Sequence, residues 1–144
     1  MRPYANFDDQ RNPTTMDRLI EALGAKVEYY PLKTRCCGGS LTGTLPESGL
    51  FCAYVLLKEA VKRGGDLIVT VCPLCHFNLD SYRDRIAAKW EPMTIPVLFF
   101  TQLMALAFDL TEKDAALWRL IQPMKPLLTY LSQPATQPSI RSAA

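Results

Sequence analysis

The sequence lacks the features of a secreted or membrane protein. Its first ten residues, MRPYANFDDQ, contain no apolar core of the kind found in signal peptides. No uninterrupted apolar run approaches the roughly 18 to 20 residues that a membrane-spanning helix needs. These two absences predict a cytoplasmic protein.

An excess of charge of one sign is also missing, and so is any internal repeat. The 16 basic and 14 acidic side chains are interspersed along 144 residues. No stripe of one sign therefore points to a nucleic acid or a membrane surface as partner. The length fits about one domain, and 49% hydrophobic residues are enough for a buried core.

Histidine is almost absent, since His76 is the only one, whereas cysteine occurs five times. Thiols in the cytoplasm are kept reduced, and an odd number of cysteines leaves one unpaired. A disulfide framework is therefore a poor explanation for these cysteines. Metal binding or redox chemistry explains them better.

Helix and strand patterns alternate along the chain, which is typical of parallel βαβ units. We expect an α/β fold, a small parallel-sheet layer domain with three or four strands. Its ligand-bearing loops should lie at the carboxyl ends of the strands. Residues 132–144, rich in Ser, Pro, Gln and Ala, are predicted to form a disordered tail. The expected helices span residues 13–23, 46–63, 73–90 and 101–110, and the expected strands lie within residues 26–32, 66–71 and 96–100.

Four cysteines form two pairs, and each pair follows an expected strand. Cys36 and Cys37 are adjacent and stand before two glycines. After thirty-four intervening residues, Cys72 and Cys75 form a C-x-x-C motif at a predicted helix start. Such a motif can be a redox-active dithiol, half of a zinc site or part of an iron–sulfur site.

The adjacent pair favours a cluster over a single ion, because neighbouring side chains diverge and do not easily reach one small centre. Two glycines after the pair allow the backbone to approach such a body closely. Three alternatives stay open: two unreactive buried pairs, zinc bound by all four cysteines, and a vicinal disulfide or dithiol switch.

Four other residues near the pairs are candidates for lesser roles. Cys52 lies within a predicted apolar helix and is expected to be a core residue. His76 can be a ligand, a proton donor or only a polar neighbour of the centre. Lys33 and Arg35 can hold an anionic substrate, offset the charge of a thiolate-bound cluster or serve solubility.

The stretches CCGGS and CPLCHFNLD, at this spacing, resemble the cysteine-rich CCG domain found in the B subunit of heterodisulfide reductase. NFDDQRNPTTMDRLIEALGAKVEYYPLKTRCCGGSL and IPVLFFTQLMALAFDL are similar to the second, C-terminal CCG domain of that polypeptide and of its relatives in sulfur-oxidising complexes. The similarity covers about residues 2–128. It places a CCG domain over residues 1–131, before the predicted tail.

The resemblance implies a [4Fe-4S] cluster of a noncubane type, with Cys36, Cys37, Cys72 and Cys75 as its ligands. It further implies an oxidoreductase that reduces or forms disulfides, of the coenzyme M–coenzyme B kind, between two such clusters with electrons arriving singly. The implied partners are a second CCG-domain chain or a second copy, and iron–sulfur and flavin subunits. The alternative is a structural zinc-binding interaction subunit without catalysis.

In that family a further ligand cysteine precedes the Arg-Pro pair that stands here as Arg2-Pro3, and another CCG domain precedes it. The sequence starts at Met1 and includes neither. A split gene, a misplaced start or a domain that works with four cysteines and a partner would each explain this. In every case we expect the chain to be catalytically incomplete without a partner chain.

Overall fold

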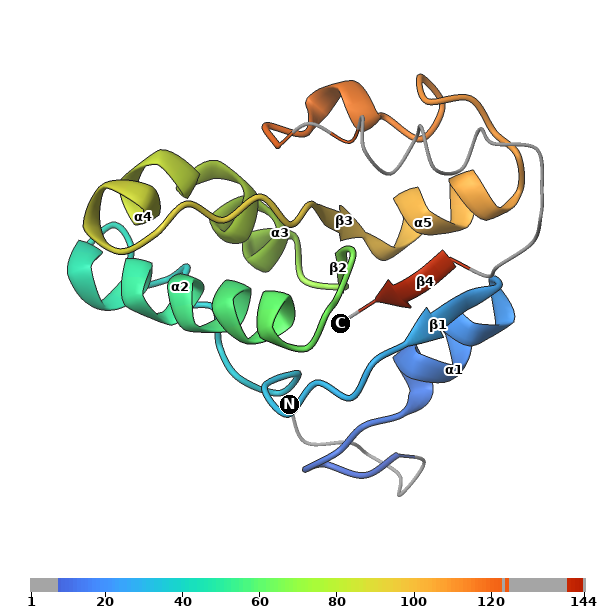
Figure 1. The fold of residues 1–144 in the computed structure, drawn as a ribbon, viewed down its shortest axis with the longest axis horizontal. Helices are drawn as coiled ribbons and strands as arrows, with labels where there is room; N and C mark the ends of the chain where they lie inside the picture. Colours follow the sequence, from blue (N-terminus) through green and yellow to red (C-terminus); the bar gives the residue numbers. More distant parts are fainter. Residues whose placement is uncertain (1–7, 123, 125–139, 144) are drawn as a thin grey trace.

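The computed structural model describes residues 8–122, 124 and 140–143 (Figure 1). Within these ranges the chain alternates between helices and short strands, as the sequence predicts for an α/β domain. None of the described helices is long and apolar enough to cross a membrane. The elements in chain order are α1 (Thr15–Ala22), β1 (Ala25–Val27), α2 (Pro46–Lys62), β2 (Ile68–Thr70), α3 (Pro73–Ser81), α4 (Arg83–Lys89), β3 (Val97–Phe99), α5 (Phe100–Ala107), the 3₁₀ helix η1 (Leu117–Arg119) and β4 (Ile140–Ala143).

All strand pairing in the described residues is parallel, and it forms two small sheets. β2 pairs with β3 in the register Ile68–Val97 and Thr70–Phe99, while β1 pairs with β4. The predicted tail, residues 132–144, lies mostly outside the described residues, and its described part, Ile140–Ala143, forms β4. The domain boundary near residue 131 also lies outside them and stays a prediction.

The β2–β3 sheet is buried on both faces, as the continuous apolar runs predict. Ile68 and Val97 pack with α2 in one hydrophobic cluster, whereas Leu98 packs with α5 in another. Successive strand residues point to opposite faces, so each strand serves both clusters. In Figure 1, α2, α3 and α4 gather on one side of β2 and β3, and α1, β1 and α5 lie on the other.

The helix predicted over residues 73–90 is divided into α3 and α4 at Tyr82. The buried guanidinium of Arg83 donates to the carbonyl of Leu79, which a continuous helix would pair with the Arg83 amide. It also donates to the carbonyls of Met93 at 3.0 Å and Ile95 at 2.7 Å. Burial lowers the pKa of Arg83 to about 10, with the charge of Asp80 opposing the shift, so the group is a cation at neutral pH. Arg83 therefore fixes the segment that leads into β3.

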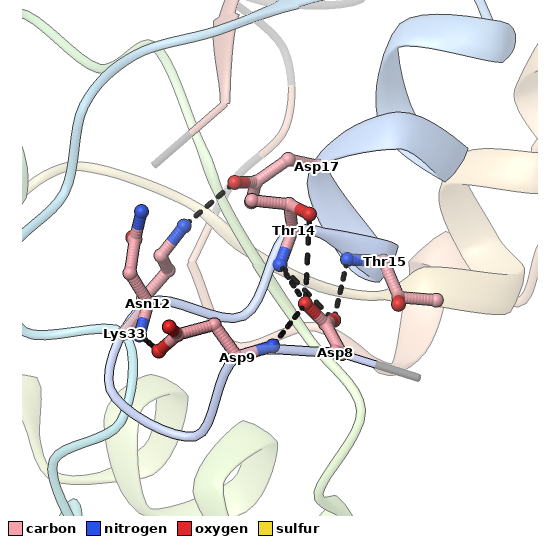
Figure 2. Close-up of polar contacts among 7 residues, drawn as sticks. All are labelled: Asp8, Asp9, Asn12, Thr14, Thr15, Asp17 and Lys33. Carbon is pink, nitrogen blue, oxygen red and sulfur yellow. Dashed lines mark hydrogen bonds and ion pairs between the residues drawn. The ribbon is translucent and has the colours of Figure 1, made fainter. Parts of the chain in front are cut away.

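The start of α1 is held by the carboxylate of Asp8 rather than by its own N-cap, Thr14. Asp8 accepts hydrogen bonds from the amide of Thr14 at 2.9 Å and the amide of Thr15 at 2.8 Å (Figure 2). Hydrogen bonding by the Thr15 side chain and by these amides lowers the pKa of Asp8. The ionised form thus stabilises the helix end.

Replacing Asp8 with Ala should lower the melting temperature at pH 7 by a few degrees. Because the folded state depresses the pKa of Asp8, its contribution is present above the unfolded-state pKa of about 3.9 and is lost as the pH falls through the lower folded-state value. The difference between wild type and Asp8→Ala should therefore shrink below about pH 4. Circular dichroism melts between pH 7 and pH 2 measure it, with Glu112→Ala as the control that removes an exposed carboxylate elsewhere. Equal melting temperatures at pH 7 would contradict the prediction.

Candidate metal centre

The second cysteine pair lies where β2 passes into α3. Cys72 is the N-cap residue of α3, with extended dihedral angles, and Pro73 occupies the first helical position. Pro favours this position because it lacks the amide hydrogen that a helix start leaves unpaired. The Thr70 hydroxyl accepts from the Cys72 amide at 3.2 Å and so fixes the turn. Cys75 follows one helical turn later, and both cysteines are half-buried.

The first pair lies in the loop between β1 and α2, and its two side chains point in different directions. Cys36 is exposed, and its Sγ accepts from the Gly38 amide at 3.4 Å. Cys37 is only 1% exposed and belongs to the hydrophobic cluster around α2. The divergence expected of adjacent residues is therefore present. Both pairs follow the carboxyl ends of strands, as predicted.

The loop that carries Cys36 and Cys37 packs closely against α2 at two glycines, Gly38 and Gly49. Gly38 has φ +77, a left-handed conformation that favours glycine. A Cβ at Gly38 would lie 2.9 Å from the Cβ of Cys52 and 2.9 Å from the Gly49 backbone. A Cβ at Gly49 would in turn lie 2.7 Å from Oγ1 of Thr42 in the same loop. The loop and the helix can approach this closely only because both positions are glycine.

Two buried polar residues that sequence reasoning missed connect the pairs. Asn78 of α3 donates from Nδ2 to the carbonyl of Cys37 at 2.8 Å, and its Oδ1 accepts from the Thr42 hydroxyl at 2.8 Å. Both are buried. The available signal was an asparagine among apolar neighbours one helical turn after Cys75, but its partner is 41 residues away in sequence.

The thiol of Cys75 lies close enough to the thiols of Cys37 and Cys72 to be affected by both. Burial raises the pKa of Cys75, and contact with the thiols of Cys37 and Cys72 raises it further. Cys72 shifts the other way, because the amides of Cys75 and Leu74 at the helix start lower its pKa. The site thus combines one thiol that favours ionisation with one that resists it. The structure brings Cys37, Cys72 and Cys75 together and turns Cys36 outward.

These cysteines are thiol donors of the type that both zinc sites and iron–sulfur sites use. A zinc site places four ligands about 2.0 to 2.3 Å from a single centre. Within the described ranges, no three Cys, His, Asp or Glu side chains are grouped tightly enough to hold a metal ion. The described residues do place three thiols from two segments beside a glycine-lined loop.

The other candidate residues occupy distinct places. Lys33 is paired with Asp17 of α1 at 2.6 Å, which ties the cysteine loop to that helix (Figure 2), and Arg35 is exposed. His76 packs edge-on against Phe99, and its buried Nε2 has no hydrogen-bond partner in the described part of the chain. Cys52, expected in the core, is half-buried beneath Gly38. It therefore lies closer to the site than its position in the sequence suggested.

The surface beside the second pair is apolar. Val71, Leu74 and Phe77 flank Cys72 and Cys75, and each is about half exposed. Leu74 also covers Gly39, since a Cβ there would lie 2.8 Å from its Cγ. The cysteines are therefore reached from solvent across an apolar rim.

Comparison with known proteins gives a family match. The family model described as a cysteine-rich domain, CCG, matches residues 3–80, a range that includes both cysteine pairs. The chain is 32% identical over 114 residues to the 8-methylmenaquinol:fumarate reductase membrane anchor subunit of Wolinella succinogenes, covering 77% of this chain and 39% of that protein.

Two archaeal proteins are similarly related. Identity is 34% over 116 residues to a protein of Archaeoglobus profundus that is described as like the B subunit of heterodisulfide reductase, covering 76% of this chain and 38% of that one. It is 35% over 105 residues to the B subunit of the ferredoxin:CoB-CoM heterodisulfide reductase of Methanosarcina mazei, covering 71% and 35%. The chain thus spans less than two-fifths of the length of these relatives.

In the metal-free chain, alkylation should modify Cys36 and Cys72 first and Cys37 last. Cys36 is exposed and Cys72 has a lowered pKa, whereas Cys37 reacts only after local opening, which should slow it about tenfold or more. Mass spectrometry of timed iodoacetamide digests measures the order, and a Cys36→Ser chain assigns the neighbouring peptide signals. Modification of Cys37 as fast as Cys36 would contradict the described loop.

Proposed function

Since the chain belongs to the cysteine-rich CCG family, we propose that it is the iron–sulfur component of a heterodisulfide-reductase-like complex. Its reaction is the reduction or formation of disulfide or related sulfur groups by single-electron transfer. The observation that carries the proposal is the convergence of Cys37, Cys72 and Cys75 from two segments beside the loop of Cys36. The names of the relatives support the class of reaction, since two of them are heterodisulfide reductase subunits or resemble one.

The ligands of the proposed [4Fe-4S] cluster, of a noncubane type, are Cys36, Cys37, Cys72 and Cys75. Bound there, the cluster would supply one-electron redox chemistry and iron that can bind a substrate sulfur. Residues of the chain itself favour thiolate formation and limit water access at this site. Helix amides favour the thiolate of Cys72, and burial of Cys37 keeps water from that side.

The reduction of a disulfide to two thiols takes two electrons, delivered one at a time, and two protons, and one proton needs a donor at the site. His76 is our candidate for supplying it, because it is the only histidine and its buried Nε2 has no partner among the described residues. Lys33 is a weaker candidate, since its ammonium is engaged by Asp17. The proposed role of His76 requires a substrate beside α3, next to the apolar rim of Val71, Leu74 and Phe77.

A second CCG domain should complete the substrate site, supplied by another chain or by a second copy of this one. Iron–sulfur and flavin subunits would deliver the electrons. The support is that two of the relatives are named as subunits of enzymes, one of a fumarate reductase and one of a heterodisulfide reductase. The exposed apolar side chains beside the cysteines suit such a contact.

Anaerobically purified protein should be brown and contain about four iron and four sulfide per chain. Replacing Cys37 with Ser should remove most of the iron, because the buried thiolate between the two segments is lost. Replacing Cys52 with Ser is the matched control. It also removes one thiol, from α2 beside the cysteine loop, but it leaves the Cys36–Cys37 and Cys72–Cys75 pairs intact. Iron, sulfide and zinc analysis with visible absorption spectra provides the measurement.

Two results would count against the proposal. A colourless protein with one zinc per chain would favour the structural zinc-binding interaction subunit instead. Equal iron content in the wild type and the Cys37→Ser chain would show that the pairs do not bind the metal.

A further inference from the structure

Asn78 is a buried amide whose hydrogen-bonding groups are committed to the cysteine loop. It is 1% exposed and lies on α3 three residues after Cys75, so the two side chains share a helix face. Its Nδ2 donates to the carbonyl of Cys37 over 2.8 Å, and its Oδ1 accepts from the hydroxyl of Thr42 over 2.8 Å. One side chain therefore connects the helix of the second pair with the backbone of the first.

The backbone on either side of this contact is also fixed. The carbonyl of Gly38 accepts from the amides of Leu41 at 2.8 Å and Thr42 at 3.2 Å, and the Thr42 hydroxyl lies 3.1 Å from it. The carbonyl of Cys37 and the carbonyl of Gly38 thus both accept hydrogen bonds from fixed donors. The direction of the Cys37 side chain follows from the orientation of its own peptide groups.

The neighbouring buried polar residues of the same helix region do not share this task. Asp80 accepts from the amides of Ile121 at 2.8 Å and Gln122 at 3.1 Å. Arg83 donates to Leu79, Met93 and Ile95. Apart from Leu79 of α3 itself, these partners lie in segments that carry no cysteine. Asn78 alone among these three residues acts on a cysteine backbone.

We propose that Asn78 is a positioning residue that sets the separation of Cys37 from Cys75 and thereby allows the two pairs to bind one cluster. This inference rests on the proposed iron–sulfur function. Without the amide donor, the carbonyl of Cys37 is left buried without a partner, and the loop can relieve this only by turning. Such a turn moves the Cys37 thiol away from the helix that carries Cys75.

The first test compares Asn78→Asp with Asp80→Asn in the loaded protein. Asn78→Asp keeps the side-chain size and an acceptor for Thr42 but places an oxygen against the carbonyl of Cys37. Iron loss to a chelator should become about tenfold faster or more, as for other supporting contacts of metal ligands, and the electron paramagnetic resonance spectrum should change. Asp80→Asn should lower the melting temperature but keep the wild-type spectrum and release rate. If Asn78→Asp releases iron at the wild-type rate and keeps the wild-type electron paramagnetic resonance spectrum, the proposal is overturned. It is also overturned if both variants release iron faster in proportion to the stability that each has lost.

The second test needs no cluster. A chain of residues 1–144 that carries Cys36→Ser, Cys52→Ser and Cys72→Ser retains only Cys37 and Cys75. Dibromobimane becomes fluorescent when it bridges two thiols. Because buried Cys37 reacts slowly in every folded chain, the quantity compared is the ratio of bridged to singly modified product, which should fall about tenfold with Asn78→Asp at equal helix content. Unchanged bridging would overturn the proposal. If the Asn78→Asp chain does not fold, Thr42→Val decides: slower bridging supports the proposal and unchanged bridging refutes it.

The two tests separate this inference from the proposed function. A wild-type protein that binds no iron would contradict the iron–sulfur function, while the bridging assay would still report on Asn78. If the protein binds iron normally and bridging is the same in the Asn78→Asp chain, the proposed function is retained and the positioning role of Asn78 is refuted.

Discussion

The hydrogen bond from the Asn78 amide to the carbonyl of Cys37 is the contact on which the candidate site depends. A buried amide or carbonyl without a partner costs about 1 to 3 kcal/mol, so this pair resists separation more than an exposed contact would. It joins residues 41 positions apart, and no secondary-structure hydrogen bond does the same for the two cysteine pairs in the described residues. The chemistry proposed for this chain follows from a structural contact that involves no thiol at all.

Helix α3 organises the surrounding fold through the same kind of contact. Asn78 binds the loop after β1, Asp80 binds the segment after η1, and Arg83, just beyond the helix, binds the segment before β3. Contacts from α3 and from the adjoining Arg83 therefore connect three stretches of chain that are distant in sequence. A cluster held beside it would be supported from several directions, which is how rigid ligand geometry is usually maintained.

The spacing of apolar residues and the positions of Pro and Gly predicted most of the helices and strands, because these signals act over a few neighbouring residues. The cysteine pairs follow β1 and β2 as expected, although these strands belong to two separate two-stranded sheets. The sequence did not predict the break at Tyr82, because it arises from Arg83 binding carbonyls at positions 93 and 95. It predicted that the adjacent cysteines diverge, but not that Cys36 would be the exposed one and Cys37 the buried one. The role of Asn78 was not predictable, since a partner 41 residues away leaves no local pattern.

The close approach of α2 to the cysteine loop has a consequence for engineering. Replacing a helical glycine with alanine is a standard way to gain up to about 1 kcal/mol of helix propensity. At Gly49 the added methyl group would lie 2.7 Å from the Thr42 oxygen and 2.8 Å from its amide nitrogen. A stabilising substitution by propensity rules would therefore push the loop off its helix. Libraries selected for thermal tolerance alone would be expected to keep this glycine, and designs based on consensus helices should leave it unchanged.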